Sequence, residues 1–279
     1  MPKTLSNTWI RIISGVVYGA LIFAGLLINS YLYAALILFL TVTMMAEFYK
    51  MTMGESYKFS RILAIAAAVI LFLLVYLSRM SVIEDKFVAL AIVPVIVVMF
   101  NSLLVKDKSE FLKFAYIYTG ILYIAIPMAM SNLLAFREGE FDGVLLLCFL
   151  IIIWMSDIGA YAVGSALGQK FGGKLAPEIS PKKSWMGFWG GLAMAVLATL
   201  VLKWAGVMSI PTIHCIALAV IMHVGGVAGD LFESMWKRCC NVKDSGNIIP
   251  GHGGMLDRLD STLMAMPLGA IYLALFNLI

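Results

Sequence analysis

Residues 144–165, with the sequence VLLLCFLIIIWMSDIGAYAVGS, decide the fold class, because Asp157 is the only charged side chain among them. A helix needs about 20 predominantly apolar residues to cross the hydrocarbon core of a bilayer. Eight further apolar stretches of similar length occur in the chain, at 9–28, 31–48, 60–78, 87–105, 112–134, 185–207, 211–230 and 258–278. We therefore expect an all-α fold: a polytopic membrane helix bundle with about nine transmembrane helices.

The composition predicts the same fold class. Of the 279 residues, 62% are hydrophobic and 13% are charged, whereas soluble domains are about 45–50% apolar and about 25% charged. Nine spans would occupy about 180 residues and leave about 100 for connections, which is too few for a separate soluble domain. A soluble enzyme and a disordered tail are excluded, and a net charge of +4 without a long basic run argues against a nucleic-acid partner.

The basic residues are distributed unevenly between the two sides of these nine spans. On the side that carries the N-terminus lie 16 of the 20 Lys and Arg residues, and the other side has only Arg79, Lys86, Arg137 and Lys203. Cytoplasmic connections are enriched in Lys and Arg, so we expect a cytoplasmic N-terminus. We divide the chain into an N-terminal transmembrane region, 1–143, with about five helices, and a catalytic transmembrane region, 144–279, with about four helices and cytoplasmic loops at 166–184 and 231–257.

The first of these loops ends with two adjacent lysines, Lys182 and Lys183. Ser180 and Ser184 are candidate helix caps, and Pro181 suits a first helical turn. Paired lysines beside a helix N-terminus form a concentrated anion site, because backbone N–H groups add to the side-chain charge. The alternative is that these lysines only anchor the helix at the lipid headgroups.

The second loop is flanked by two acidic stripes. Residues separated by three or four positions share a helix face, which groups Asp230, Glu233, Ser234 and Lys237 before the loop and Asp257, Asp260 and Ser261 after it. The loop returns the chain to the same membrane face, so the stripes can meet. Facing carboxylates near hydrocarbon repel each other unless a cation lies between them, and oxygen ligands suit Mg²⁺. The alternative is a salt-bridge network without a ligand.

Other polar groups accompany these stripes. We expect phosphate charge to be neutralised by Lys237, Arg238, Lys243 and Arg258, and the glycines Gly251, Gly253 and Gly254 to let backbone N–H groups approach a phosphate. Asp157 is a functional candidate because it is an ionisable residue inside a span, although helix packing is an equal alternative. His214 and His223 are expected to serve packing or hydrogen bonding, whereas His252 lies in the glycine loop.

The segment between the stripes resembles the signature of the phosphatidate cytidylyltransferases, also called CDP-diacylglycerol synthases. The matching pattern is Ser234-x-x-Lys237-Arg238-x4-Lys243-Asp244-x-Gly246-x-x-Ile249-Pro250-x-His252-Gly253-Gly254-x-x-Asp257-Arg258-x-Asp260. Weaker blocks at 157–161 and 180–187 resemble the same family. Three positions depart from its pattern, namely Ser156, Met186 and Trp236, and none of them is a carboxylate, glycine or basic residue of the signature.

This resemblance implies an integral membrane nucleotidyltransferase of phospholipid biosynthesis that converts CTP and phosphatidate to CDP-diacylglycerol and pyrophosphate. It further implies dependence on Mg²⁺, with a second cation left open, and an active site on the cytoplasmic side of the cell inner (plasma) membrane. In this interpretation the catalytic residues are Asp230, Asp257, Lys237 and Arg258, and the metal ligands are Asp230, Asp257 and Asp260. Substrates would be bound by Lys182, Lys183, Ser234, Arg238, Lys243, Asp244, His252, Gly253 and Gly254.

The sequence argues against two alternative functions. An anion transporter would also need acidic and basic groups, but transport sites more often lie at mid-depth between inverted repeats, whereas these groups cluster at one face. A CDP-alcohol phosphotransferase would carry a D-G-x-x-A-R motif, which does not occur here. The acyl-chain preference, the residues that bind the cytosine base and the formation of a homodimer stay open.

Overall fold

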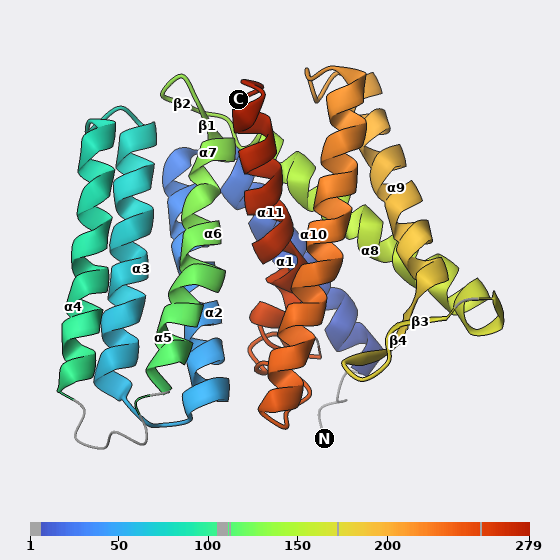
Figure 1. Cartoon of the computed structure of the whole chain (residues 1–279). Helices are drawn as coiled ribbons and strands as arrows, with labels where there is room; N and C mark the ends of the chain where they lie inside the picture. The colour runs from blue at the N-terminus through green and yellow to red at the C-terminus, as the bar shows by residue number, and fades with distance from the viewer. Residues whose placement is uncertain (1–6, 105–110, 112, 172, 252) are drawn as a thin grey trace, which may run out of the picture.

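The computed structural model describes residues 7–104, 111, 113–171, 173–251 and 253–279. It is a helical bundle with two short β-hairpins (Figure 1). In chain order the elements are α1 (Asn7–Leu27), α2 (Ser30–Met53), α3 (Lys58–Arg79), η1 (Asp85–Ala91), α4 (Ile92–Leu103), α5 (Phe114–Gly120), η3 (Ile121–Ala125), α6 (Ile126–Met130), α7 (Asn132–Ala135), β1 (Phe136–Arg137), β2 (Glu140–Phe141), α8 (Val144–Phe171), β3 (Lys174–Ala176), β4 (Ser180–Ser184), α9 (Trp185–Trp204), α10 (Thr212–Cys239) and α11 (Leu256–Leu275).

Each predicted span corresponds to a helix or to a continuous helical segment, so the expected fold class is confirmed. Within the described residues, seven segments are long and apolar enough to cross a membrane. The other two predicted spans are α1, whose apolar part is shorter, at Arg11–Leu27, and α11, whose first five residues include Asp257, Arg258 and Asp260. These charged residues lower the mean hydropathy of α11, and they are also candidates for the chemistry of the site.

The two ends of the bundle differ in what they carry. The described N-terminus, the β3–β4 hairpin and the lower end of α10 lie at one end, and the C-terminus and the β1–β2 hairpin lie at the other (Figure 1). The described parts of the two connections that follow α8 and α10 were predicted to share the N-terminal side, and they do lie at one end of the molecule. Which end faces the cytoplasm stays a prediction.

The hairpin at β3–β4 differs from the sequence-based expectation. Ser180–Ser184 forms a strand rather than a first helical turn, and it pairs antiparallel with Lys174–Ala176. The prediction that Pro181 lies in a first helical turn was therefore wrong. Ser184 does cap α9, because its Oγ accepts a hydrogen bond from the Gly187 backbone N–H at 3.2 Å. Helices α8 and α10 also extend to Phe171 and Cys239, so each predicted cytoplasmic loop begins later than 166 and 231.

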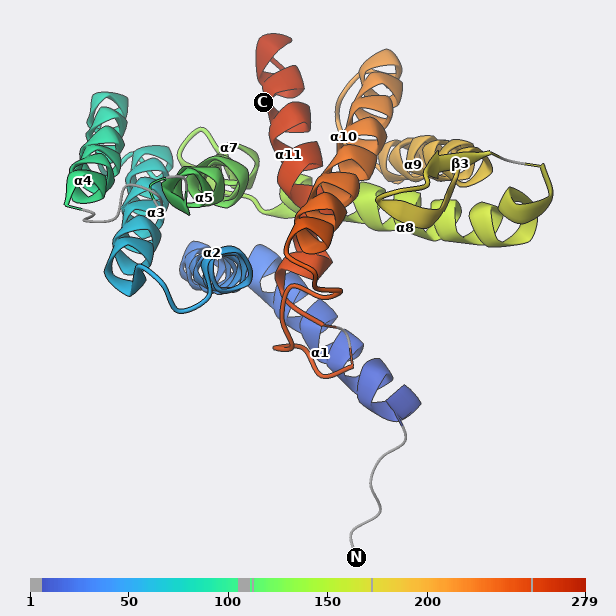
Figure 2. The same cartoon turned by 60° about the horizontal axis from the view of Figure 1, so that its bottom comes forward.

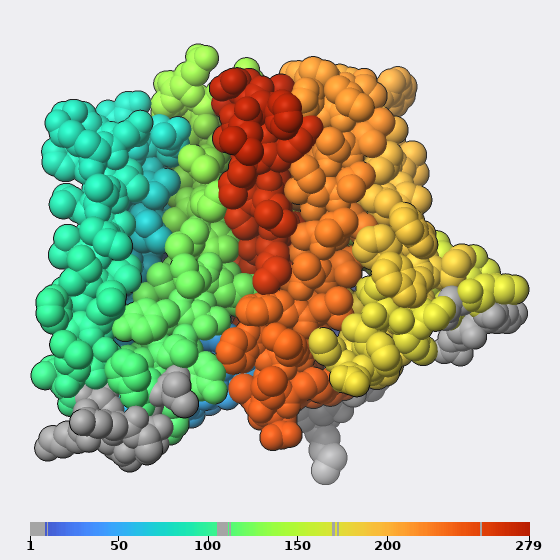
Figure 3. Space-filling model, viewed as in Figure 1, coloured from blue at the N-terminus to red at the C-terminus, as the bar shows by residue number. Residues whose placement is uncertain are grey.

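Most of the largest fully buried side chains lie in the N-terminal region, among them Tyr33, Phe48, Tyr49, Phe72 and Phe114. They fill the contacts that α2 makes with α3 and α5. Helices α10 and α11 stand between this core and the α8–α9 pair (Figure 2), and α11 runs down the face shown in Figure 3. The N-terminal region is thus a packed scaffold on one side of α10 and α11.

Helices α8 and α9 approach each other through glycines. A Cβ added to Gly190 would lie 2.5 Å from Val163 Cγ2 and 3.0 Å from the Gly159 carbonyl oxygen. A Cβ added to Gly159 would lie 2.7 Å from the Gly190 carbonyl oxygen. Small residues at such crossings let two helix backbones pack closely inside a membrane. This crossing sets the distance between the two helices that carry Asp157 and the hairpin.

We expect Gly190→Leu to force α8 and α9 apart. Overpacking of this kind costs about 1–3 kcal/mol, and the loss should appear as a lower melting temperature of the detergent-purified protein. Gly19→Leu is the matched control, because a Cβ at Gly19 meets no described atom within 4 Å. Equal melting temperatures for the two variants would contradict the proposed close crossing.

Candidate active site

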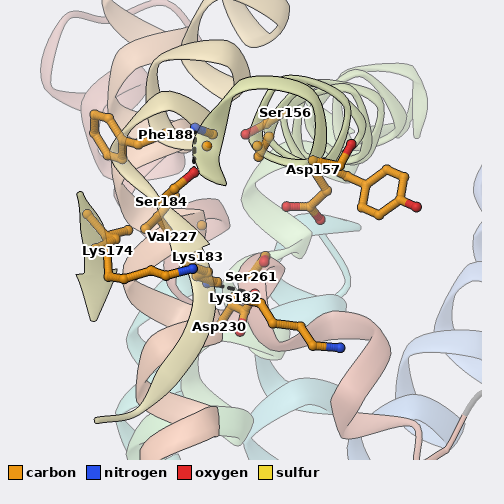
Figure 4. Close-up of a pocket in the computed structure, with 18 of the residues that line it drawn as sticks. Ser156, Asp157, Lys174, Lys182, Lys183, Ser184, Phe188, Val227, Asp230 and Ser261 are labelled. Carbon is orange, nitrogen blue, oxygen red and sulfur yellow. Dashed lines mark hydrogen bonds and ion pairs between the residues drawn. The ribbon is translucent and has the colours of Figure 1, made fainter. Parts of the chain in front are cut away.

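A cavity of about 570 Å³ lies between α8, α9, α10 and the β3–β4 hairpin (Figure 4). Most of its lining is small or apolar. The charged residues among its described lining are Asp157 on α8, Lys174 on β3, Lys182 and Lys183 on β4, and Asp230 on α10. An apolar wall combined with lysines and carboxylates suits a ligand that has both a hydrocarbon part and an anionic part.

Asp230 connects the hairpin to α10. Its Oδ2 lies 2.7 Å from Lys183 Nζ, and its Oδ1 accepts a hydrogen bond from Ser234 Oγ at 3.2 Å. Side chains alternate between the two faces of a strand, so Lys183 turns inward and is partly buried whereas the neighbouring Lys182 is exposed. The predicted pair of lysines therefore does two different things: Lys183 binds Asp230, and Lys182 stands at the exposed edge of the cavity.

A second cluster lies where the two predicted acidic stripes meet. Lys237 Nζ lies 2.7 Å from Asp257 Oδ1 and forms an ion pair with Glu233 one turn earlier on α10. Asp257 Oδ2 accepts three further hydrogen bonds, from Gly254 N at 2.8 Å, Ser245 N at 3.0 Å and Ser245 Oγ at 3.1 Å. The carboxylate of Asp257 thus joins α10, α11 and the loop between them.

Asp257 precedes the predicted span at 258–278, and its environment favours the ionised form. Burial alone would raise the pKa of this carboxyl, but hydrogen bonds from Lys237 and from the Gly254 backbone N–H outweigh burial and lower the pKa below its usual value. Donors contact both of its oxygens, as they do both oxygens of Asp230, and the role of Asp257 as a metal ligand stays a prediction. Its contacts make it the anchor of the loop.

Other carboxylates near the site also offer the oxygen donors that a divalent cation prefers. Among the described residues, no three Asp, Glu, His or Cys side chains already converge as a metal site. Asp157 and Asp230 nevertheless face one cavity from two helices and offer the carboxylate oxygens that Mg²⁺ prefers. Asp260 lies one turn after Asp257 on α11, and its Oδ1 accepts a hydrogen bond from Ser261 N at 2.7 Å. The donor chemistry therefore fits the predicted Mg²⁺ ligands Asp230, Asp257 and Asp260, with Asp157 as a further oxygen donor at the cavity.

Other predicted site residues lie around these two clusters. Arg238 Nε donates to the Ile179 carbonyl oxygen at 3.4 Å and so links α10 to the hairpin. Lys243, Asp244 and Arg258 are exposed. Gly253 has φ +87°, and a Cβ there would lie 2.9 Å from Asp257 Oδ2, so this glycine makes room for the anchor. His252 lies outside the described residues.

The two described histidines hold helices together, as expected. His214 Nδ1 lies 2.8 Å from the Tyr272 hydroxyl, and His223 Nδ1 lies 2.7 Å from Ser156 Oγ. Ser156 also lines the cavity, next to Asp157.

Three residues near the site were missed by the sequence analysis. Lys174 lines the cavity, Glu47 on α2 accepts hydrogen bonds from the start of α11, and Arg11 on α1 donates to the Gly251 carbonyl oxygen at 2.8 Å. Glu47 had a detectable signal, because it is an ionisable residue inside the predicted span 31–48. Its partners could not be found from sequence, since they lie about 200 positions away.

Comparisons with known proteins identify the family of this chain. The profile of the cytidylyltransferase family matches residues 9–276. A phosphatidate cytidylyltransferase of Bacillus subtilis is 38% identical over 189 residues, which are 67% of this chain and 68% of that protein. Proteins of the same name from Staphylococcus epidermidis and Pseudomonas aeruginosa are 34% identical over 173 residues and 37% identical over 153 residues, covering 62% and 54% of this chain and 64% and 55% of their own lengths.

The family profile spans nearly all of the chain, including the N-terminal region, which carries no part of the signature. The signature residues fall on the elements that surround the cavity and its adjoining loop. The chain therefore belongs to the cytidylyltransferase family and is a membrane-embedded nucleotidyltransferase.

Proposed function

We propose that this protein transfers the cytidylyl group of CTP to phosphatidate, giving CDP-diacylglycerol and pyrophosphate, in phospholipid biosynthesis. The observation that carries this proposal is the family match over residues 9–276, together with relatives named phosphatidate cytidylyltransferase. The amphipathic cavity agrees with it, because phosphatidate has acyl chains and a phosphate monoester.

The first task of such an enzyme is to bring two anions together. Lys174, Lys182 and Lys183 supply positive charge on the hairpin side of the cavity. Arg238 and Arg258 supply it on the side of α10 and α11. Cationic groups on both sides would neutralise the repulsion between the lipid phosphate and the triphosphate, and holding reactants in contact supplies a large part of a rate enhancement.

The transfer needs no covalent enzyme intermediate. An oxygen of the lipid phosphate attacks the α-phosphorus of CTP, a new P–O bond forms, and the bond to the β-phosphate bridging oxygen breaks, so that pyrophosphate leaves with its electron pair. The lipid phosphate is already ionised at neutral pH, so no protein base has to remove a proton from it. Positioning and charge stabilisation therefore account for the catalysis, as in other phosphoryl transfers.

Mg²⁺ would be held by Asp230, Asp257 and Asp260, with Asp157 as a further oxygen donor at the cavity, and it would neutralise negative charge on the triphosphate. Asp257 would also anchor the loop that carries Lys243. Lys237 compensates the charge of both Asp257 and Glu233. We further propose that this end of the bundle faces the cytoplasm of the bacterial inner membrane, where CTP is available, in agreement with the distribution of basic residues.

Purified protein should release pyrophosphate when it is given CTP, phosphatidate and Mg²⁺, and the release should stop when a chelator removes the cation. Omission of either substrate is the control, and dCTP, ATP and GTP test which nucleotide is used. Absence of pyrophosphate from monodisperse protein at saturating lipid would refute the proposed reaction.

Lys182→Ala should weaken substrate use without unfolding the protein, because Lys182 is exposed. Loss of one charge-assisted contact to a phosphate is worth about 1.5–3 kcal/mol, so we expect kcat/KM to fall about tenfold or more. Lys86→Ala is the matched control, since Lys86 is exposed at the opposite end of the bundle and pairs with Glu84. Unchanged saturation curves for both CTP and phosphatidate would favour the alternative, in which Lys182 only anchors the helix at the lipid headgroups.

Asp257→Asn should lower both activity and stability, because only 6% of the Asp257 side chain is exposed and an amide cannot accept from Lys237 and the loop together. Removing one partner of such a buried pair costs about 3–5 kcal/mol. The lowered pKa means that Asp257 stabilises the wild type above about pH 4 and that this contribution is lost as the pH falls further. Melting curves should therefore depend less on pH in Asp257→Asn than in wild type below about pH 4. Glu84→Gln, an exposed substitution, is the control.

A further inference from the structure

Glu47 is a buried carboxylate in the N-terminal region, far in sequence from the signature. It lies near the end of α2, and only 6% of its surface is exposed. A carboxylate cannot be buried beside a hydrocarbon core at low cost unless its oxygens are hydrogen-bonded. The hydrogen-bond partners of Glu47 therefore show which part of the structure this residue stabilises.

All of the described hydrogen-bond partners of Glu47 belong to the loop and helix start that carry Asp257. Oε1 accepts from Met255 N at 3.0 Å, and Oε2 accepts from Leu256 N at 2.9 Å and from Ser245 Oγ at 3.3 Å. The first backbone N–H groups of a helix have no partner inside the helix. Met255, the N-cap residue of α11, makes no side-chain capping bond, so Glu47 caps α11 from another helix.

Two glycines of the signature make space for this carboxylate. A Cβ on Gly254 would lie 2.7 Å from Glu47 Oε2, and a Cβ on Gly246 would lie 2.8 Å from Glu47 Cδ. The Gly254 backbone N–H donates to Asp257, and a Cβ on this residue would collide with Glu47. At Gly246 a side chain would collide with the Glu47 carboxylate, and at Gly254 it would collide with Ser245 Oγ as well as with Glu47. The approach of a phosphate to Gly254 stays a prediction.

Helix α1 holds the outer part of the same loop. Arg11 Nε donates to the Gly251 carbonyl oxygen at 2.8 Å, and Ser14 Oγ donates to the Pro250 carbonyl oxygen at 3.0 Å. The described part of the loop is therefore attached to α1 near residue 250 and to α2 at Ser245 and at the start of α11. Both attachments come from the N-terminal region.

We propose that Glu47 is a positioning residue for nucleotidyl transfer: it fixes the 245–256 loop and the first turn of α11, so that Asp257, Arg258 and Asp260 are presented to the substrates in one geometry. The inference rests on the proposed function for its catalytic consequence. Its structural part, the attachment of the loop through one buried carboxylate, stands independently.

Glu47→Ala and Glu47→Gln, with Glu55→Gln as the control, test this role. Glu55 is an exposed acid just beyond the end of α2. The amide of Gln can accept only through one oxygen and so leaves the donors on the other side unpaired. A displacement of about 1 Å in a catalytic constellation can cost about 10²-fold, so we expect a loss of kcat of about that size per folded Glu47→Ala molecule. We expect partial recovery, to about a tenfold loss, in Glu47→Gln and no change in Glu55→Gln.

Hydrogen exchange of the same detergent-purified proteins separates positioning from general destabilisation. In Glu47→Gln, peptides covering 245–257 should exchange faster, whereas peptides from α8 and α9 should exchange as in wild type. Wild-type kcat in Glu47→Gln, or faster exchange spread evenly over the chain, would overturn the inference; if Glu47→Ala does not fold, Glu47→Gln alone decides. An inactive wild type would refute the proposed reaction instead, and the exchange of 245–257 would still test the attachment.

Discussion

The hydrogen bonds around the Asp257 carboxylate are the constraint on which the rest of the site depends. One oxygen binds the ammonium of Lys237 at 2.7 Å, and the other collects the loop donors Ser245 and Gly254. In a chain with so few charges, an unpaired carboxylate at this depth would be strongly destabilising. Full pairing makes it a junction that determines where α10, α11 and the loop meet.

The acidic residues near this junction fall into two groups with different contacts. Glu233, Lys237 and Asp257 form a compensated cluster in which every charge has a nearby opposite charge. Asp157 and Asp230 instead line a cavity, where Lys183 binds Asp230. The first cluster joins α10, α11 and the loop, and the second group faces the cavity.

The two halves of the chain are mechanically connected at this site. The large buried aromatic residues of α2, α3 and α5 make the N-terminal region a firm support. Glu47 and Arg11 of this region hold the loop through hydrogen bonds to its backbone. A loop tied at both ends loses less conformational entropy when substrates bind, which is an advantage for a reaction that depends on positioning. The N-terminal region therefore matters for more than membrane insertion.

Much of this architecture follows from local sequence. Apolar stretches such as 144–165 determine the helices, because a backbone in hydrocarbon must satisfy its own hydrogen bonds. The spacing of Asp230, Ser234 and Lys237 likewise determines that they share a helix face, since this depends only on helical geometry. The β3–β4 hairpin was not predicted, because Ser180-Pro181 also suits a helix start and the decision depends on pairing with residues 174–176. The same limit applies to Asp257 and Glu47: sequence alone identified the first as chemically important and left the second unnoticed. Only the tertiary structure decided that both bind the same loop. The partners of Glu47 are about 200 positions away, and such hydrogen bonds exist only after the helices have packed.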